Sequence, residues 1–154
     1  MPPQYIFQIE NLSKSIAKRD ILKFEGCTLA WQRALEAAGV TLGDLSFVET
    51  HDCFTIAELI EYEAMGLAAE GQGGRAVAEG WTQMDGRLPV NPSGGLKAKG
   101  HPIGATGVSM HALAAMQLTA TAGGMQVKDA RLGGIFNMGG TAVANYVSIL
   151  ERIK

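Results

Sequence analysis

The chain has 154 residues, of which 47% are hydrophobic and 18% are charged, and its formal net charge is -2. A chain of this length is expected to form one domain, residues 1–154, around a single core. The composition is typical of a soluble globular protein without the basic excess that nucleic-acid binding needs, and no apolar run is long enough to span a membrane. We therefore expect neither nucleic acid nor a membrane as a partner.

The chain has two cysteines, Cys27 and Cys53, and no apolar N-terminal segment preceded by positive charge. This pattern favours neither secretion nor a disulfide framework, so we expect the cytoplasm. Of the 20 glycines, 16 lie between Gly71 and Gly140. Such clusters indicate tight turns and close approach of the backbone to a ligand.

The first half alternates strand and helix. The expected elements are a strand at Tyr5–Ile9, a helix at Arg19–Ala38, a strand at Leu45–Glu49 and a helix at Cys53–Met65. The apolar residues taken for the buried sides of the helices are Ile21, Phe24, Leu29, Trp31 and Leu35 in the first, and Phe54, Ile56, Leu59, Ile60 and Met65 in the second. The alternation predicts an α/β layer with functional groups at the carboxyl ends of the strands, where His51 and Asp52 fall.

The second half begins with a glycine-rich excursion at 68–92, with one helical turn near Ala76–Glu79. A long helix is expected at Ile103–Ala122; small and apolar residues lie almost all round it, so it should be buried on more than one side. Two closing strands, Ala130–Phe136 and Ala144–Leu150, should be joined through a turn at Asn137–Gly140.

The stretch from Asn91 to Gly107, NPSGGLKAKGHPIGATG, is the most informative. It places His101 on a glycine-bounded turn at the start of the long helix, where free N–H groups and the helix dipole disfavour imidazolium. A neutral His101 could act as a base or as a hydrogen-bond donor. Taken alone, a histidine among glycines is more often a turn or capping residue.

Three segments together resemble a known family. The run Asn91–Gly107 is similar to the glycine-histidine-proline signature of thiolases. The tetrapeptide His51–Phe54 resembles the second active-site motif of sterol-carrier-protein-2-type thiolases and their bacterial and archaeal relatives, and Leu132–Gly140 resembles the last catalytic loop. The segments occur in family order, so the chain from about Arg19 onward resembles the C-terminal half of a thiolase.

The resemblance implies an α/β fold with a mixed sheet of about five strands covered by helices. It also implies an acyl-CoA or β-ketoacyl-CoA substrate, thiolysis or Claisen condensation, and no bound cofactor. In the family, the histidine at the place of His101 helps to generate a nucleophilic thiolate and binds the thioester oxygen together with a water or donor held by the residue at the place of His51. An oxyanion hole and a separate acid/base are what this chemistry needs. Without the family match, His51 could equally satisfy a local backbone carbonyl.

The resemblance assigns the acid/base to Cys53, because Asn137 stands where other subfamilies carry a cysteine and asparagine cannot shuttle a proton. Without the resemblance, Cys53 reads as a small buried apolar side chain. Asn137 is expected to line the site, with a turn-forming role as its alternative. The residues expected beside the substrate are Phe54, Gly95, Gly139 and Gly140.

Other sites are not favoured. Cys27 has no histidine near it in sequence and should belong to the core. No His-x-x-x-His or Cys-x-x-Cys spacing joins His51, His101 and His111, so no metal site is expected. The glycine clusters do not match the sequence motif of a phosphate-binding loop.

No segment resembles the family's loop that carries the nucleophilic cysteine. We therefore expect a thiolase-type acyltransferase half that acts with an N-terminal half or as a homo-oligomer, since the long helix alone would expose an apolar side. Two alternatives remain: a subunit of a thiolase-like aldolase of steroid side-chain degradation, and a non-catalytic interaction module.

Overall fold

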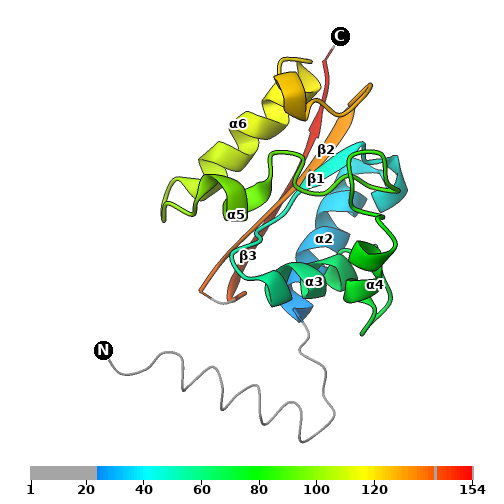
Figure 1. The fold of residues 1–154 in the computed structure, drawn as a ribbon. Helices are drawn as coiled ribbons and strands as arrows, with labels where there is room; N and C mark the ends of the chain where they lie inside the picture. Colours follow the sequence, from blue (N-terminus) through cyan, green and yellow to red (C-terminus); the bar gives the residue numbers. More distant parts are fainter. Residues whose placement is uncertain (1–23, 141, 154) are drawn as a thin grey trace, which may run out of the picture.

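The computed structural model describes residues 24–140 and 142–153. Its elements, in chain order, are α2 (Glu25–Ala38), η1 (Leu42–Asp44), β1 (Phe47–Glu49), α3 (Thr55–Ala64), α4 (Gly73–Ala78), α5 (Gly95–Lys99), α6 (Thr106–Leu118), η2 (Gly123–Met125), β2 (Leu132–Gly139) and β3 (Ala144–Glu151) (Figure 1). The expected strand at Tyr5–Ile9 and the start of the first expected helix lie outside the described residues.

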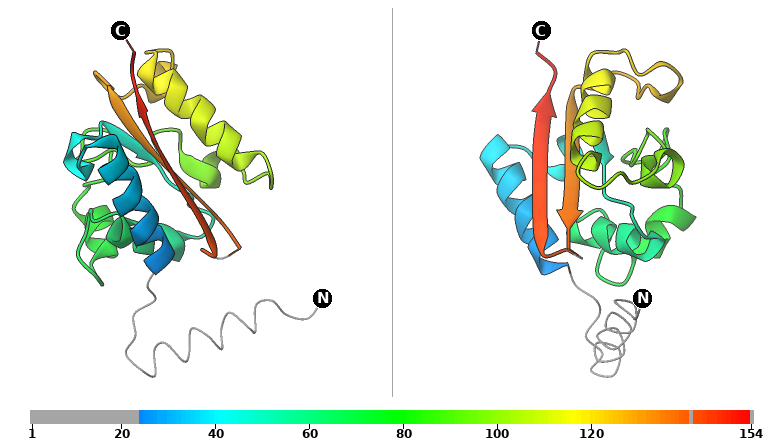
Figure 2. Two further views of the ribbon diagram at one scale, coloured as in Figure 1. Left: turned by 180° about the vertical axis from the view of Figure 1, so that it is seen from behind. Right: turned by 90° about the vertical axis from the view of Figure 1, so that its left-hand side faces the viewer.

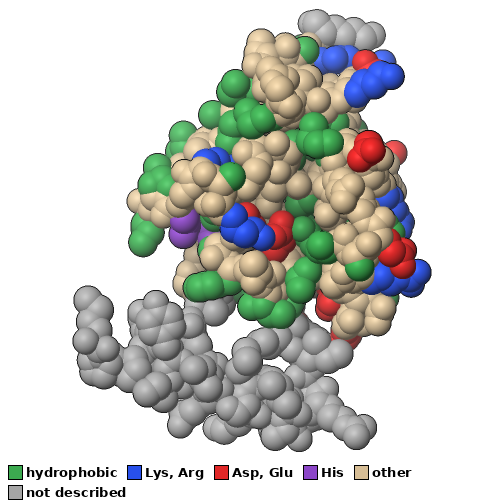
Figure 3. Space-filling model, viewed as in Figure 1, with side chains coloured by type: hydrophobic (Ala, Val, Ile, Leu, Met, Phe, Trp, Pro, Cys, Tyr) green, Lys and Arg blue, Asp and Glu red, His purple; other side chains and the backbone are tan. Residues whose placement is uncertain are grey.

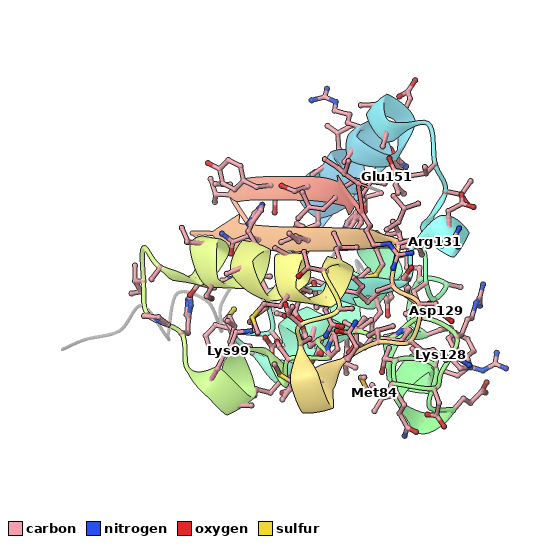
Figure 4. All side chains as sticks on the ribbon, turned by 90° about the horizontal axis from the view of Figure 1, so that it is seen from above. Met84, Lys99, Lys128, Asp129, Arg131 and Glu151 are labelled. Carbon is pink, nitrogen blue, oxygen red and sulfur yellow. The ribbon has the colours of Figure 1, made fainter. Side chains whose placement is uncertain are left out.

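The strands form one sheet in the order β1-β2-β3, with β1 parallel and β3 antiparallel to β2. Its mixed character was expected, but the expectation of about five strands was wrong for the described part of the chain, where the sheet has three. The segment before Asn91 runs beside β1 but contributes a single bridge, Val48 to Val90, instead of a strand. The opposite end of the sheet from Lys99 carries Arg131 and Glu151 (Figure 4).

The sheet lies between helices. Figure 2 shows α2 on one face and α6 on the other. The first apolar cluster, between the sheet and α2 and α3, includes Cys27, Trp31 and Phe136; the second, beneath α6, includes Met110 and Ile135. Alternate residues of β2 supply the two clusters because successive side chains of a strand point to opposite faces. The prediction that Cys27 belongs to the core is confirmed, since it is fully buried.

Close packing of α2 on the sheet depends on a glycine in β2. A Cβ at Gly134 would lie 2.8 Å from Cη2 of Trp31 and 2.9 Å from Cδ1 of Leu45. Carbon atoms pack at about 3.5–4.0 Å, so a side chain there would push α2 off the sheet.

The buried face of α3 differs from the expected one. Phe54 and Ile56 are 58% and 56% exposed, and the side chains that are buried are Ala57, Ile60, Glu61, Tyr62 and Ala64. Positions 57, 60, 61 and 64 follow the helical repeat of three and four residues, so this face, which includes a glutamate, packs inward.

The long helix α6 is also buried on one side only within the described chain. Met110, Ala114 and Leu118 are buried, whereas Val108 is 73% exposed and Ile103, before the helix, is 93% exposed. The expectation of burial on several sides was therefore wrong for this chain by itself. The face left open is apolar because its side chains are small or aliphatic.

Candidate active site

Two parallel strands bring the predicted residues together. His51 follows the carboxyl end of β1, and Asn137 lies near the carboxyl end of β2. Asn137 belongs to the strand, where it pairs with Tyr146, and not to the expected turn. Being two residues after Ile135, its side chain lies on the face covered by α6, and a Cβ on Gly107 of that helix would lie 2.9 Å from its Nδ2.

His51 is buried and held by Asn137. Oδ1 of Asn137 lies 2.7 Å from Nδ1 of His51. An amide oxygen only accepts, so Nδ1 donates the hydrogen bond and carries the proton. Desolvation by burial lowers the pKa of His51, and the neighbouring His101 lowers it further, against the opposite effects of Asn137 and Asp52. His51 is therefore a neutral imidazole at neutral pH, with its Nε2 lone pair free to accept a hydrogen bond.

His101 meets His51 edge to face, with ring centroids 4.8 Å apart and planes at 86°. Oγ1 of Thr106 lies 2.7 Å from Nδ1 of His101 and donates its own hydrogen to the carbonyl of Pro102 at 3.2 Å. Since a hydroxyl has one hydrogen, Thr106 accepts from Nδ1 of His101. His101 thus presents Nε2 for chemistry.

The helix-start expectation for His101 was wrong. α6 begins at Thr106, five residues later, and the short helix α5 ends before His101. Pro102 disfavours helical backbone in the residue before it, and Gly104 has φ of +89°. His101 therefore lies before α6 and is positioned by the hydroxyl of Thr106, the first residue of that helix.

Buried carboxylates join the loop after β1 to the segment that leads to His101. Glu49 accepts hydrogen bonds from the backbone N–H and the hydroxyl of Ser93, at 3.2 and 2.7 Å. Oδ1 of Asn91 accepts the N–H of Thr50 at 2.8 Å. These bonds hold the two segments in register, and so set the approach of the two histidines.

Asp52 makes the tightest of these connections. Its buried carboxylate accepts the backbone N–H groups of Leu96, at 2.7 Å, and Lys97, at 3.3 Å. Gly95 has φ of +67°, and any Cβ there would overlap the carboxylate. Gly95, predicted to lie beside the substrate, lets the backbone approach Asp52.

Lysines of α5 balance these charges. Nζ of Lys97 pairs with Glu58 and lies 4.0 Å from Oδ2 of Asp52. Nζ of Lys99 lies 3.4 Å from Glu49 and 2.8 Å from the hydroxyl of Ser93. Two basic residues of one short helix therefore offset buried carboxylates, which are costly to leave unpaired.

Cys53 lies two residues after His51 and is half-buried. It packs against the apolar cluster between the sheet and α2 and α3. Burial raises the pKa of its thiol, and the charges of Glu61 and Asp52 raise it further. The thiol is thus the form present at neutral pH, which suits an acid that must hold its proton until needed.

Two exposed aromatic side chains neighbour Cys53 and Asn137. Phe54, next to Cys53, is 58% exposed, and Tyr146, the β-sheet partner of Asn137, is 65% exposed. Gly139 ends β2 and Gly140 follows with φ of +59°. Figure 3 shows apolar side chains on the side of the molecule where α5 and α6 lie, beside a histidine.

The described residues contain no group of three potential metal ligands. Nor does any helix among them combine the length and the apolar character needed to cross a membrane. His111 bonds other groups: its Nδ1 donates to the carbonyl of Gly107 at 2.7 Å, and its Nε2 lies 3.0 Å from the hydroxyl of Ser148. Location in the cytoplasm stays a prediction.

Several residues that build the site were not singled out by the sequence. Glu49, Asn91 and Ser93 act through long-range hydrogen bonds, Thr106 acts through a local one to His101, and Glu61 is a charged residue on a buried helix face. Asn91, Ser93 and Thr106 lie within the segment already recognised as a motif. For Glu61 the sequence held one sign of burial: it lies among apolar residues that recur at helical spacing.

The family described as thiolase C-terminal domain-like matches residues 10–152. The chain belongs to this family. The resemblance to a thiolase C-terminal half is therefore confirmed.

Relatives agree with this assignment. The chain is 42% identical over 153 residues to the acetyl-CoA acetyltransferase of Methanothermobacter thermautotrophicus, and the match covers 97% of this chain and 40% of that protein. It is 40% identical over 132 residues to human sterol carrier protein 2, covering 84% of this chain and 24% of that protein. The chain thus spans less than half the length of these relatives.

Two further comparisons concern a subunit and a solved structure. A benzoylsuccinyl-CoA thiolase subunit, BbsB, of Thauera aromatica is 40% identical over 93 residues, which are 60% of this chain and 24% of that protein. Among solved structures, the Ltp2-ChsH2(DUF35) aldolase is similar with a TM-score of 0.69 and 24% identity, over 83% of this chain and 32% of that chain. The last comparison shows the α/β thiolase-like fold.

Proposed function

We propose that this thiolase C-terminal domain supplies one half of the active site of an acyl-CoA acyltransferase that cleaves or forms β-ketoacyl-CoA. The observation that carries the proposal is the meeting of His51, His101 and Asn137, which come from three separate segments, at the carboxyl ends of two parallel strands. The named activities of the relatives, acetyl-CoA acetyltransferase and thiolase subunit, support the substrate class.

In this proposal His101 is the base. With its proton held on Nδ1 by Thr106, its Nε2 lone pair can take the proton of a cysteine thiol, and the resulting N–H can then donate to the thioester oxygen. His51 has the same tautomer, so its Nε2 accepts a hydrogen bond from a water, and that water donates its other hydrogen to the same oxygen. Both effects stabilise negative charge that develops on the oxygen during the reaction.

Cys53 is the proposed acid/base that moves a proton to or from the α-carbon of the acyl group. Asn137 cannot transfer a proton, and its part is to fix the tautomer and orientation of His51. We assign Phe54, Gly139 and Gly140 to the substrate wall around Cys53 and Asn137. Gly95 acts indirectly, through the close approach to Asp52.

The nucleophilic cysteine has to come from another polypeptide segment. We propose that an N-terminal thiolase half, or a second copy of the chain, covers the open face of α6, where Val108 and the preceding Ile103 are 73% and 93% exposed. Two apolar side chains this open are costly to leave in water once a partner can cover them. The relative BbsB is named as a subunit of a benzoylsuccinyl-CoA thiolase, which supports action together with a partner chain.

The test is thiolysis of acetoacetyl-CoA by the purified chain, alone and mixed with the separately expressed N-terminal part of the Methanothermobacter acetyltransferase. We expect activity only in the mixture, and a loss of at least about 100-fold with His101→Ala, as is usual for removal of a general base. His111→Ala is the matched control, because it removes a histidine from α6 that lies outside the site. Its mixture should keep the activity.

Other results would identify the alternatives. Complex formation without thiolysis, but with retro-aldol cleavage of a β-hydroxyacyl-CoA, would replace the acyltransferase by the aldolase named in the structural comparison. Complex formation with neither activity would leave a non-catalytic interaction module.

A further inference from the structure

One carboxylate beside the site has no role in the proposed reaction, yet it contacts the segment that leads to His101 at two points. Glu58 lies on α3, and its side chain is 13% exposed. Its Oε1 accepts hydrogen bonds from the hydroxyl of Tyr62, at 2.7 Å, and from Nδ2 of Asn91, at 3.3 Å. Its Oε2 accepts a hydrogen bond from Nζ of Lys97 on α5. Glu58 therefore holds the first residue of this segment and a second residue close to His101.

Asn91 extends this contact to the loop that carries His51. Oδ1 of Asn91 accepts the backbone N–H of Thr50, the residue before His51, at 2.8 Å. A backbone N–H only donates and a carboxylate only accepts, so a single orientation of the Asn91 amide satisfies both neighbours. An amide rotated by half a turn would present the wrong atom to each of them. Glu58 thus fixes the acceptor that holds Thr50.

The backbone of Asn91 also depends on a fixed side chain. Its φ is +51°, in the left-handed region, which is unfavourable for residues other than glycine and least so for asparagine and aspartate. Its N–H donates to the carbonyl of Val48 in β1 at 2.7 Å, and its carbonyl accepts the N–H of Gly94 at 2.8 Å. The turn at Asn91 therefore sets the direction in which the chain leaves β1 for α5 and His101.

The helix α3 holds Thr50 by a second contact. The hydroxyl of Thr50 donates a hydrogen bond to Oε2 of Glu61, which lies one turn after Glu58. Thr50 is buried, so its N–H and its hydroxyl both find partners within the protein. The loop before His51 is thus attached to α3 directly through Glu61 and indirectly through Asn91 and Glu58. The same helix therefore supports both segments that carry a histidine of the site.

We propose that Glu58 is a positioning residue for the two histidines of the site. Its carboxylate fixes Asn91 at the start of the segment 91–101 and Lys97 near its end, and through Asn91 it holds this segment against the loop that carries His51. The edge-to-face contact between the rings of His51 and His101 depends on this support. The use of the contact in acyl transfer rests on the proposed function.

The first test exchanges the two partners of one hydrogen bond. Asn91→Asp brings a second carboxylate to Glu58, and the repulsion should abolish the nuclear Overhauser effect between the rings of His51 and His101, observed by NMR in the chain alone. Adding Glu58→Gln to this variant restores a carboxylate and an amide in exchanged places and keeps the net charge of the pair, so the effect should return. A wild-type signal in Asn91→Asp, or a double variant as impaired as Asn91→Asp, would overturn the proposal.

A second measurement covers the case in which the first variant does not fold. Glu58→Gln alone keeps the size of the side chain, but an amide can offer a hydrogen as well as an oxygen and no longer fixes the orientation of Asn91. Hydrogen exchange of the Thr50 N–H should become at least about tenfold faster. Glu63→Gln is the matched control, because Glu63 lies on the same helix and accepts the N–H of Gly73 instead, at 2.8 Å. Exchange of Thr50 at the wild-type rate in Glu58→Gln would refute the proposal.

The kinetics distinguish positioning from a general loss of stability. In the mixture used for thiolysis, Glu58→Gln should lower kcat about tenfold with little change in KM, because Glu58 acts on the geometry of the histidines. An equal loss of kcat in Glu63→Gln would contradict a specific role of Glu58. The ring signal and the exchange of Thr50 need neither a CoA ester nor a second half, so a negative thiolysis assay leaves both intact, and their failure leaves the proposed acyltransferase untouched.

Discussion

Oδ1 of Asn137 lies 2.7 Å from Nδ1 of His51, and this bond joins the ends of two neighbouring strands. The amide oxygen faces the imidazole and therefore stabilises its protonated form, although burial lowers the pKa of His51 overall. The side chain at position 137 thus controls the charge of the buried histidine.

Substitution of Asn137 should move the pKa of His51 in either direction. Asn137→Asp places a carboxylate beside Nδ1 and should raise the pKa by about 1–2 units, whereas Asn137→Leu removes the acceptor and should lower it further. The ring resonances of His51, followed by NMR over a pH series, measure both shifts. His111, which bonds Gly107 and Ser148 instead, provides the internal control. Identical titrations of His51 in the three proteins would show that the observed bond has no effect on its charge.

The contact between Gly95 and Asp52 leads to a prediction about stability. Gly95→Ala would strain a backbone with φ of +67° and force the Asp52 carboxylate away from the N–H of Leu96. We expect the free energy of unfolding to fall by about 3 kcal/mol, from backbone strain and a lost hydrogen bond to a charged group. Urea denaturation followed by circular dichroism measures the change.

Gly74→Ala is the matched control for this loss. Gly74 is the second residue of α4, and a Cβ there would meet no atom within 4 Å. This alanine should leave the protein as stable as the wild type or add about 0.5–1 kcal/mol, because alanine loses less backbone entropy on folding. Equal stabilities of the two variants would contradict the packing of Asp52 against Gly95.

The parts of the site that lie within short motifs could be predicted from the sequence. The sequence predicts His51, His101 and Asn137 in one site because each falls in a segment with a recognisable family pattern, and the structure brings the three side chains together at the ends of two parallel strands. The tautomers could not be predicted. They depend on Thr106 and on the Asn137 side chain, whose contacts form only in the folded chain.

Helix faces were predicted less well, for a physical reason. In α3 the sequence pattern selects Phe54 and Ile56 as buried, yet the helix turns Ala57 and Glu61 inward. The apolar character of a side chain does not show whether it packs into the core of its own domain or lies on a surface that a partner could cover. The same ambiguity affected α6, whose outer residue Val108 is open in this chain.

The two cysteines should differ strongly in reactivity. Cys27 is fully buried, donates a hydrogen bond to Oδ1 of Asn145 at 3.1 Å, and has a pKa raised to about 12. Cys53 is only half-buried. In the native protein we expect iodoacetamide to modify Cys53 at least about 100-fold faster than Cys27, since the thiolate is the reactive form.

Peptide mass spectrometry separates the two sites, and unfolding in urea should abolish the difference. The comparison needs no substitution. Modification of Cys27 at the rate of Cys53 in the folded chain would mean that the packing of α2 against the sheet opens readily, contrary to the burial of its thiol.

Burial raises the pKa of Glu61 well above its ordinary value, and this shift also predicts how stability depends on pH. In the folded chain the carboxyl keeps its proton above about pH 4.5, where the unfolded chain has released it, so the folded state binds more protons. The free energy of unfolding should therefore fall as pH rises from about 4.5 to the pKa of folded Glu61, by about 1.4 kcal/mol for each unit of the shift. Lowered pKa values act oppositely: His51 should cause stability to rise with pH up to about 6.5.

Urea denaturation at a series of pH values should separate these two contributions. In Glu61→Gln the decline above about pH 4.5 should disappear, because glutamine does not ionise, while the rise due to His51 should remain. The variant should then lack the loss of stability that the raised pKa of Glu61 causes in the wild type as the pH rises above about 4.5. A wild type and a Glu61→Gln variant with parallel stability profiles would show that Glu61 ionises normally, and its burial beneath the 50–53 loop would then have no electrostatic consequence.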